Sequence, residues 1–251
     1  MDKKLLLLTL TGVTATAAMA QKDVDKPNFV VILVDDLGYS DFSCYGGVIP
    51  TPHIDKLAER GVRMSQMYNT ARSCPTRASL LTGLYPQQAG VGHMTADLTK
   101  ETGSAAYQGY LNETSVTMAE VLGSNGYFTS MVGKWHVGHA KGVTPFKRGF
   151  QRTLHSAAGG FYFPQDEKAV LFLDDQKISN DDPRLPENWY STDLWTYMGI
   201  QFINEAINSK KPFFLYLANN APHFPLQAPA DEIAKFKGKF SKGWDVLREE
   251  I

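Results

Sequence analysis

The feature that most constrains the fold is an almost continuous apolar run, NFVVILVDD, from Asn28 to Asp36, which ends in two adjacent acids. Such a run is typical of a strand that is covered on both faces, as strands are in parallel sheets. The run therefore predicts that a sheet of buried parallel strands begins here.

Helix signals follow this strand at once. In TPHIDKLAERG, Thr51 suits a helix cap, Pro52 suits the first helical position, and Gly61 suits the end of the helix. We expect a second strand over residues 62–68. The segment thus predicts a strand, a helix and a strand in succession.

The same alternation continues along the chain. Periodicity and end signals predict two further helices over 117–124 and 193–209, and two further strands over 127–132 and 212–218. Alternating strands and helices predict an α/β fold, with a mainly parallel sheet flanked by helices on both faces. Residues 146–186 interrupt the pattern with glycine, proline and aromatic residues, and we interpret them as an insertion that lines a cleft.

Composition and the N-terminus limit the classes of function. The 251 residues are 43% hydrophobic, which suffices for a core, and the formal charge of −1 provides neither a basic field for nucleic acid nor a polybasic patch for membranes. Residues 1–20 join two lysines to a leucine run and end in small residues, as a secretory signal peptide does. The apolar run is shorter than the roughly 20 residues of a membrane span. We therefore expect cleavage before Gln21, no membrane anchor afterwards, and a periplasmic or secreted protein.

Export places Cys44 and Cys74 in an oxidising compartment. Two cysteines in a domain of this size do not form a disulfide framework, so we expect two unpaired thiols.

Asp35 and Asp36 lie where the first strand ends, at the edge where open α/β sheets gather ligands. Adjacent carboxylates repel each other, and a hard cation with oxygen ligands relieves that repulsion. Taken alone, the pair fits an ordinary acidic turn equally well.

The stretch ARSCPTRASLLTG, residues 71–83, contains the candidate nucleophiles. Pro75 suits a first helical position, which puts Ser73 and Cys74 at the positive end of a helix that runs to about Thr82. Ser73 and Arg77 are four residues apart and share a face, whereas Cys74 is rotated off that face by about 100°. Considered by itself, Ser73 fits an ordinary helix cap.

Two further stretches bring polar residues to strand ends. GKWHVG places Lys134 and His136 two apart, so in an extended segment both side chains point the same way, which suits anion binding and proton transfer. NNAPHFPLQAP follows the strand expected over 212–218 and holds His223 between two prolines. We interpret the other four histidines as structural.

These stretches, together with NFVVILVDDLGYSDFSCYGG, TPHIDKLAERGVRMSQMY and GWDVLREE, resemble in order the motifs of type I sulfatases, most closely the arylsulfatases, in the alkaline phosphatase superfamily. The family signature is Cys or Ser, any residue, Pro, any residue, Arg. Pro75 and Arg77 place its first position at Ser73, and Cys74 falls on the variable position. The resemblance implies a serine-type sulfatase in which a maturase oxidises Ser73 to Cα-formylglycine.

The resemblance also implies a mechanism and a set of roles. One hydroxyl of the hydrated aldehyde attacks the sulfur of a sulfate ester and expels the alcohol, and the other hydroxyl then collapses to the aldehyde and releases sulfate. Carried over residue by residue, calcium is bound by Asp35, Asp36 and the modified Ser73. Arg77 and Lys134 hold the hydrate and the sulfate, His136 assists the elimination, and His223 binds sulfate or protonates the leaving oxygen.

The family places an Asp-Asn calcium pair, one further lysine and a C-terminal subdomain after the GWD stretch. The 251 residues contain none of these, so we expect residues 21–251 to be the N-terminal part of a catalytic domain, with reduced activity by itself. Two alternatives stay open. One is a phosphoryl-transfer enzyme of the same superfamily, and the other is a binding protein that keeps the sulfatase fold without catalysis.

Overall fold

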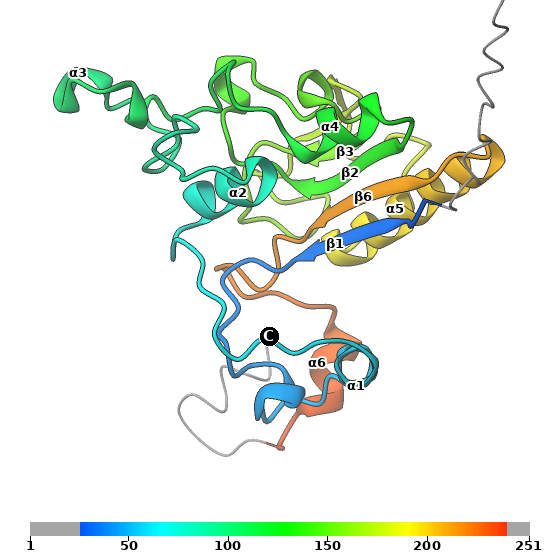
Figure 1. The fold of residues 1–251 in the computed structure, drawn as a ribbon. Helices are drawn as coiled ribbons and strands as arrows, with labels where there is room; N and C mark the ends of the chain where they lie inside the picture. The colour runs from blue at the N-terminus through cyan, green and yellow to red at the C-terminus, as the bar shows by residue number, and fades with distance from the viewer. Residues whose placement is uncertain (1–25, 240–251) are drawn as a thin grey trace, which may run out of the picture.

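A computed structural model describes residues 26–239 of the chain (Figure 1). The signal peptide expected over residues 1–20 and the helix expected from Trp244 lie outside the described residues. None of the helices within 26–239 combines the length and the apolar character that crossing a bilayer requires.

A six-stranded mixed sheet forms the centre of the fold, in the spatial order β1-β6-β2-β3-β4-β5. Its first four strands run parallel, and β4 and β5 are added to β3 in antiparallel fashion. The strands are β1 (Phe29–Leu33), β2 (Phe128–Lys134), β3 (Arg152–Ser156), β4 (Leu171–Leu173), β5 (Gln176–Ile178) and β6 (Phe213–Ala218).

Helices cover both faces of this sheet (Figure 1). On one face lie α2 and α4, and on the other lies the long helix α5. The helices are α1 (Pro52–Arg60), α2 (Ser73–Thr82), α3 (Thr99–Thr102), α4 (Met118–Ser124), α5 (Ser191–Asn208) and α6 (Ala230–Phe236). Four 3₁₀ turns join them: η1 (Ser43–Tyr45), η2 (Ala105–Tyr107), η3 (His139–Lys141) and η4 (Phe146–Arg148). The expectation of an α/β fold with helices on both faces of a mainly parallel sheet is confirmed.

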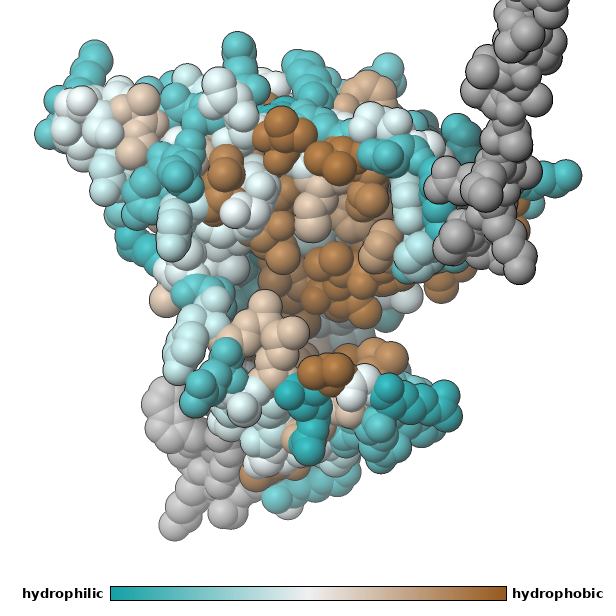
Figure 2. All heavy atoms as spheres, viewed as in Figure 1, coloured by the Kyte–Doolittle hydropathy of each residue, from teal (hydrophilic) through white to brown (hydrophobic). Residues whose placement is uncertain are grey.

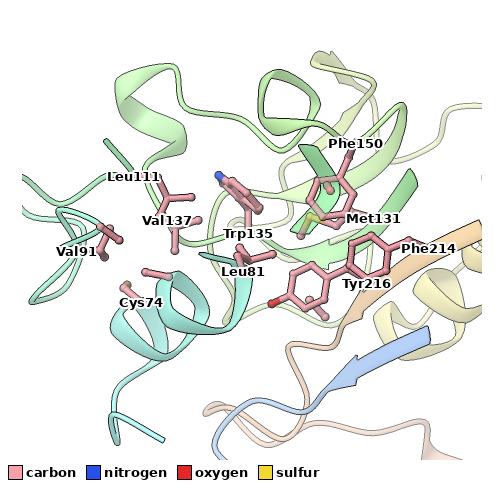
Figure 3. Close-up of a cluster of buried hydrophobic side chains, with 14 of the residues drawn as sticks. Cys74, Leu81, Val91, Leu111, Met131, Trp135, Val137, Phe150, Phe214 and Tyr216 are labelled. Carbon is pink, nitrogen blue, oxygen red and sulfur yellow. The ribbon is translucent and has the colours of Figure 1, made fainter. Parts of the chain in front are cut away.

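The strands bury alternate residues in two separate clusters, because successive side chains of a strand point to opposite faces. Met131 of β2 packs with Cys74 and Leu81 of α2, whereas its neighbour Val132 packs with Leu194 of α5. Figure 3 shows the first cluster, in which the aromatic rings of β6 and the apolar side chains of α2 meet Trp135. This cluster fixes α2 against the sheet beside the ends of β2 and β6.

Most predicted elements form within two residues of their expected bounds. Helix α4 begins as expected after Thr117, whose hydroxyl accepts a hydrogen bond from the Glu120 amide while the Glu120 carboxylate accepts one from the Thr117 amide. Such a capping box satisfies two amides that have no partner within the helix. Helix α5 starts at Ser191 and ends at Asn208, close to the expected 193–209.

Two predictions were wrong. No strand forms over 62–68, where Val62 and Tyr68 are each 87% exposed, because no described strand pairs with this segment. Residues 146–186 are more than an insertion: they supply β3 as a parallel member of the main sheet and the β4–β5 hairpin at its edge. The short strands in this segment were hidden among its glycine, proline and aromatic residues.

The first strand also differs from its prediction. β1 pairs with β6 in parallel, but Phe29, Val30 and Ile32 are 41%, 49% and 51% exposed. Figure 2 shows apolar residues gathered in the hollow over β1. The apolar run is therefore a parallel edge strand within residues 26–239, and the described residues leave much of it uncovered.

Candidate functional site

The candidate site lies at the carboxyl ends of β1, β2 and β6. Two backbone hydrogen bonds fasten the loops after β1 and β6 to each other: the Asn219 amide donates to the Leu33 carbonyl at 2.9 Å, and the Asp35 amide donates to the Ala221 carbonyl at 3.1 Å. A cavity of about 380 Å³ opens beside these loops, bordered by residues 33–38 and by the start of α2. The strand ends thus place Asp35 and Asp36 at its wall.

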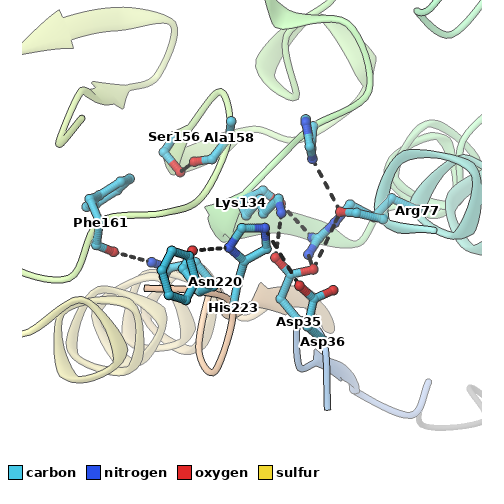
Figure 4. Close-up of polar contacts among 12 residues, drawn as sticks. Asp35, Asp36, Arg77, Lys134, Ser156, Ala158, Phe161, Asn220 and His223 are labelled. Atoms are coloured by element: carbon cyan, nitrogen blue, oxygen red, sulfur yellow. Dashed lines mark hydrogen bonds and ion pairs between the residues drawn. The ribbon is translucent and has the colours of Figure 1, made fainter. Parts of the chain in front are cut away.

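Asp35 is the centre of a buried ionic network (Figure 4). Its Oδ1 lies 3.2 Å from Nη2 of Arg77 and its Oδ2 lies 2.5 Å from Nζ of Lys134; the Asp35 side chain is 4% exposed, and the two cations are 1% exposed. Burial by itself raises the pKa of Asp35, but the two cations outweigh it and hold this pKa below its ordinary value. One carboxylate therefore neutralises part of a site with two buried cations.

Ser73 is the first residue of α2, and three candidate groups surround its hydroxyl. Nε of Arg77 donates to Oγ at 3.2 Å, the hydroxyl donates to Oδ1 of Asp35 at 3.4 Å, and Nδ1 of His136 lies 3.3 Å from Oγ. The cap position belongs to Arg72, so Ser73 is not an ordinary helix cap. Pro75 occupies the third helical position instead of the first, because the helix begins at Ser73. The expected face shared by Ser73 and Arg77 is present.

Lys134 and His136 both reach the site, but a bent backbone brings them there. His136 has a φ of 57°, in the left-handed region that side chains other than glycine seldom occupy. Burial lowers the pKa of His136 to about 3, with Lys134 and Arg77 adding to the effect, so its imidazole is neutral at neutral pH. Burial also lowers the pKa of Lys134, and Asp35 opposes that shift.

A glycine allows β2 and β6 to approach each other where the site begins. Gly133 has a φ of 101°, and a Cβ at this position would lie 2.0 Å from the carbonyl oxygen of Ala218. A side chain here would push apart the strands that deliver Lys134 and the loop after β6. The glycine that opens GKWHVG is thus required by the packing of the site.

His223 and Asp36 form the open side of the site (Figure 4). Nε2 of His223 lies 3.7 Å from Oδ2 of Asp36, whose side chain is 58% exposed. Asp36 has a φ of 63°. Strained backbone at Asp36 and His136, on two separate strand ends, is the pattern found at functional sites.

A buried network that the sequence analysis missed holds the His223 loop. Asn220 is fully buried; its Oδ1 accepts a hydrogen bond from Nε1 of Trp195 at 2.8 Å, and its side-chain amide donates to the Phe161 carbonyl. The hydroxyl of Tyr162 donates to the carbonyl of His223. The neighbouring Asn-Asn pair in NNAPHF was the available signal, since a buried asparagine after a strand needs several partners.

Cys74 lies outside the polar site. Its side chain is fully buried in the apolar cluster of Figure 3, and burial raises the pKa of its thiol, so it is a poor nucleophile. Cys74 and Cys44 are both free thiols, as expected.

Part of a calcium shell is present in the described residues. Asp35 and Asp36 offer carboxylate oxygens, the hard donors that calcium prefers, beside Ser73. Within 26–239 no group of three or more His, Cys, Asp or Glu side chains is placed to hold a metal ion. Calcium takes about 6 to 8 oxygen ligands, so these residues fit a part of a site.

Comparison with known proteins identifies the class. The sulfatase family model matches residues 27–250, and this chain belongs to the sulfatase family. The chain is 38% identical to an arylsulfatase of Klebsiella aerogenes over 262 aligned residues, covering 100% of this chain and 54% of that protein. It is also 38% identical to an uncharacterized sulfatase of Schizosaccharomyces pombe, covering 91% of this chain and 44% of that protein. The chain therefore spans about half the length of these curated relatives.

The fold agrees with this assignment. The solved structure of Ps i-CgsB in complex with k-i-k-neocarrahexaose superposes with a TM-score of 0.73 at 30% identity, covering 90% of this chain and 53% of that one. The resemblance to sulfatases is thus confirmed in sequence and in structure.

Proposed function

We propose that the complete protein hydrolyses sulfate esters and uses Ser73, oxidised to Cα-formylglycine, as its nucleophile. The observation that carries this proposal is the convergence of Arg77, Asp35 and His136 on the Ser73 hydroxyl, at 3.2–3.4 Å, while the adjacent thiol is buried in the core. Membership of the sulfatase family, with an arylsulfatase among the relatives, supports the reaction class. The oxidised residue would supply, as a hydrate, a hydroxyl that attacks sulfur.

The buried cations are suited to hold a sulfate group. Nη1 of Arg77 donates to the Lys134 carbonyl at 2.9 Å, and with Nε held near Ser73 this fixes the plane of the guanidinium. A guanidinium fixed in advance donates to developing negative charge without reorganising. Lys134 adds a second positive charge from the other side of Asp35. Both cations thus favour an anion beside Ser73.

The two histidines fit complementary proton transfers. His136 is neutral and lies 3.3 Å from the Ser73 hydroxyl, so its Nδ1 can accept a proton from the group formed there. His223 lies at the exposed side of the site, where the alcohol portion of an ester would leave. We assign to it the delivery of a proton to the leaving oxygen.

Calcium is the metal that we propose for this site. Asp35 and Asp36 would hold it together with the oxidised Ser73, and the remaining ligands would come from the rest of the protein. When bound, the ion would neutralise sulfate oxygens and lower the pKa of the attacking hydroxyl. The substrate class that we propose is an aryl sulfate or a sulfated sugar.

Maturation and export complete the proposal. A formylglycine-generating maturase that acts on serine is the required partner, and we place the mature protein in the periplasm or outside the cell, with its N-terminus at Gln21. N-terminal sequencing of exported protein tests the cleavage site. Retention of residues 1–20 on the exported protein would contradict it.

The test of the nucleophile uses 4-nitrophenyl sulfate and four variants of the complete protein. Ser73→Ala removes the carbon that becomes the aldehyde, so hydrolysis should fall to background. Arg77→Lys keeps the charge but loses the paired donors, and transition-state stabilisation should fall by roughly 2 to 4 kcal/mol. Ser73→Cys should remain active where the maturase accepts cysteine.

Cys74→Ala is the matched control, since it alters the neighbouring residue but leaves the polar site in place. Mass spectrometry of the peptide that contains both residues should show the loss of two hydrogens at Ser73 after co-expression with the maturase. If Cys74→Ala abolished hydrolysis while Ser73→Ala preserved it, the assignment of the nucleophile would be wrong.

A further inference from the structure

Arg72 borders the same cavity as Ser73, but the proposed reaction does not use it. The residue stands at the cap position of α2 in an extended conformation, with φ −141° and ψ 145°. A turn sets this position: the side-chain oxygen of Asn69 accepts a hydrogen bond from the Ala71 amide at 2.6 Å, and Ala71 has a φ of 54°. The local backbone thus holds Arg72 at the rim of the cavity, directly before the nucleophile.

The three cations of the site differ in what they are bound to. Arg77 and Lys134 are buried and share the carboxylate of Asp35, whereas Arg72 is exposed. Within residues 26–239 no carboxylate lies within ion-pair distance of the Arg72 guanidinium. Its positive charge is therefore available to an anion that enters the cavity.

A histidine holds this guanidinium in place. Nη1 of Arg72 lies 2.6 Å from Nε2 of His93. Arginine can only donate, so Nε2 of His93 accepts, and the ring carries its proton on Nδ1. The contact uses one N–H of the guanidinium and leaves others of its planar fork for a second acceptor, which suits paired hydrogen bonds to a sulfate or carboxylate.

We propose that Arg72, held by His93, forms a second anion subsite beside the sulfate-cleaving centre and selects substrates that carry a further sulfate or carboxylate near the scissile ester. This inference rests on the proposed function for the position of the scissile group. A purely structural role, in which the Arg72–His93 contact ties α2 to the loop after it, would affect all substrates alike. The two roles are therefore separated by selectivity and not by activity alone.

The test compares 4-nitrophenyl sulfate with 2-carboxy-4-nitrophenyl sulfate, which differ by one carboxylate beside the ester. The ratio of their kcat/KM values is measured for wild-type protein, Arg72→Gln and His93→Phe. Because intrinsic reactivity of the esters cancels between enzymes, a change in this ratio reports recognition of the carboxylate. We expect the ratio to fall about tenfold in Arg72→Gln and by a smaller factor in His93→Phe, which frees the guanidinium without removing it.

Arg184→Gln is the matched control. Arg184 is also an exposed arginine with a side-chain partner, Asp182 at 2.6 Å, but it lies outside the cavity, so the ratio should stay at the wild-type value. An unchanged ratio in Arg72→Gln would overturn the subsite, even if both rates fell together.

A binding measurement keeps the inference independent of catalysis. In a Ser73→Ala background, titration calorimetry should give a Kd about tenfold lower for the carboxylated ester than for 4-nitrophenyl sulfate, and adding Arg72→Gln should remove the difference. Equal Kd values in the Ser73→Ala background would contradict the subsite. Failure of wild-type protein to hydrolyse either ester, with the binding difference intact, would instead count against the proposed reaction.

Discussion

Two regions of this chain respond differently to the same kind of sequence signal. The packed region, residues 73–218, buries Leu81 of α2 and Phe214 of β6 to 1% exposure or less. The open region, residues 29–68, contains the apolar strand β1 and the amphipathic helix α1, yet α1 buries no residue and its Leu57 is 63% exposed. A local pattern suffices to specify a helix or strand, but burial requires a second surface to pack against.

The candidate site lies where these regions meet, and each contributes differently to it. Ser73, Arg77, Lys134 and His136 are fixed by elements of the packed region. The open region supplies Asp35, which two cations of the packed region hold, and Asp36, which remains exposed. The packed region thus determines the geometry around the nucleophile, and the following comparisons test this division.

The largest expected contrast is between the two adjacent carboxylates. Asp35→Asn leaves Arg77 and Lys134 buried without their counter-charge, so the free energy of unfolding should fall by about 3 to 5 kcal/mol. Asp36→Asn is the matched control; its side chain is 58% exposed, and asparagine tolerates the positive φ of this residue, so the change should stay within about 0.5 kcal/mol. Urea unfolding of both variants measures the difference. Equal losses would show that the cations do not depend on Asp35.

A leucine pair tests packing directly. Leu81→Ala creates a cavity in the cluster of Figure 3 and should cost about 2 to 5 kcal/mol. Leu57→Ala removes an exposed side chain from α1 and should cost no more than about 0.5 kcal/mol. Urea titration gives both values. A loss above about 2 kcal/mol for Leu57→Ala would mean that the open region is packed in solution.

The smallest contrast concerns acids in the first turns of two helices. Glu120 closes the capping box of α4 and pairs with Arg148 at 2.9 Å, so Glu120→Gln should cost about 1 kcal/mol at pH 7. Asp55 in α1 accepts a hydrogen bond from Ser43 at 2.7 Å but is exposed to solvent, so Asp55→Asn should cost less.

The pH dependence gives this last comparison its sign. Burial by itself raises the pKa of Glu120, but hydrogen bonds from Arg148 and the Thr117 amide outweigh it and lower this pKa below its ordinary value of 4.5. A carboxyl with a lowered pKa stabilises the fold above about pH 4.5 and loses that contribution as the pH falls through its folded-state pKa. The difference between wild type and Glu120→Gln should therefore shrink in acid. A difference that is constant from pH 7 to pH 3 would exclude the charged form as its cause.

Much of this architecture could be predicted from the sequence. Caps and apolar periodicity determined α2, α4, α5, β2 and β6 to within two residues, because those signals act over a few neighbouring positions. The spacing of Ser73 and Arg77 likewise predicted their shared face, since one helical turn is local geometry. The order of the motifs identified the sulfatase family before any coordinates were considered.

The tertiary structure alone decided which of these signals became a buried site. No local pattern could show that 62–68 lacks a strand partner, that β3 lies hidden in 146–186, or that Tyr162 would hold the loop of His223. The neutral state of His136 has the same origin, because its pKa depends on burial and on cations that are far away in the sequence. Sequence specifies short-range backbone geometry, whereas desolvation and long-range contacts arise only when distant segments pack together.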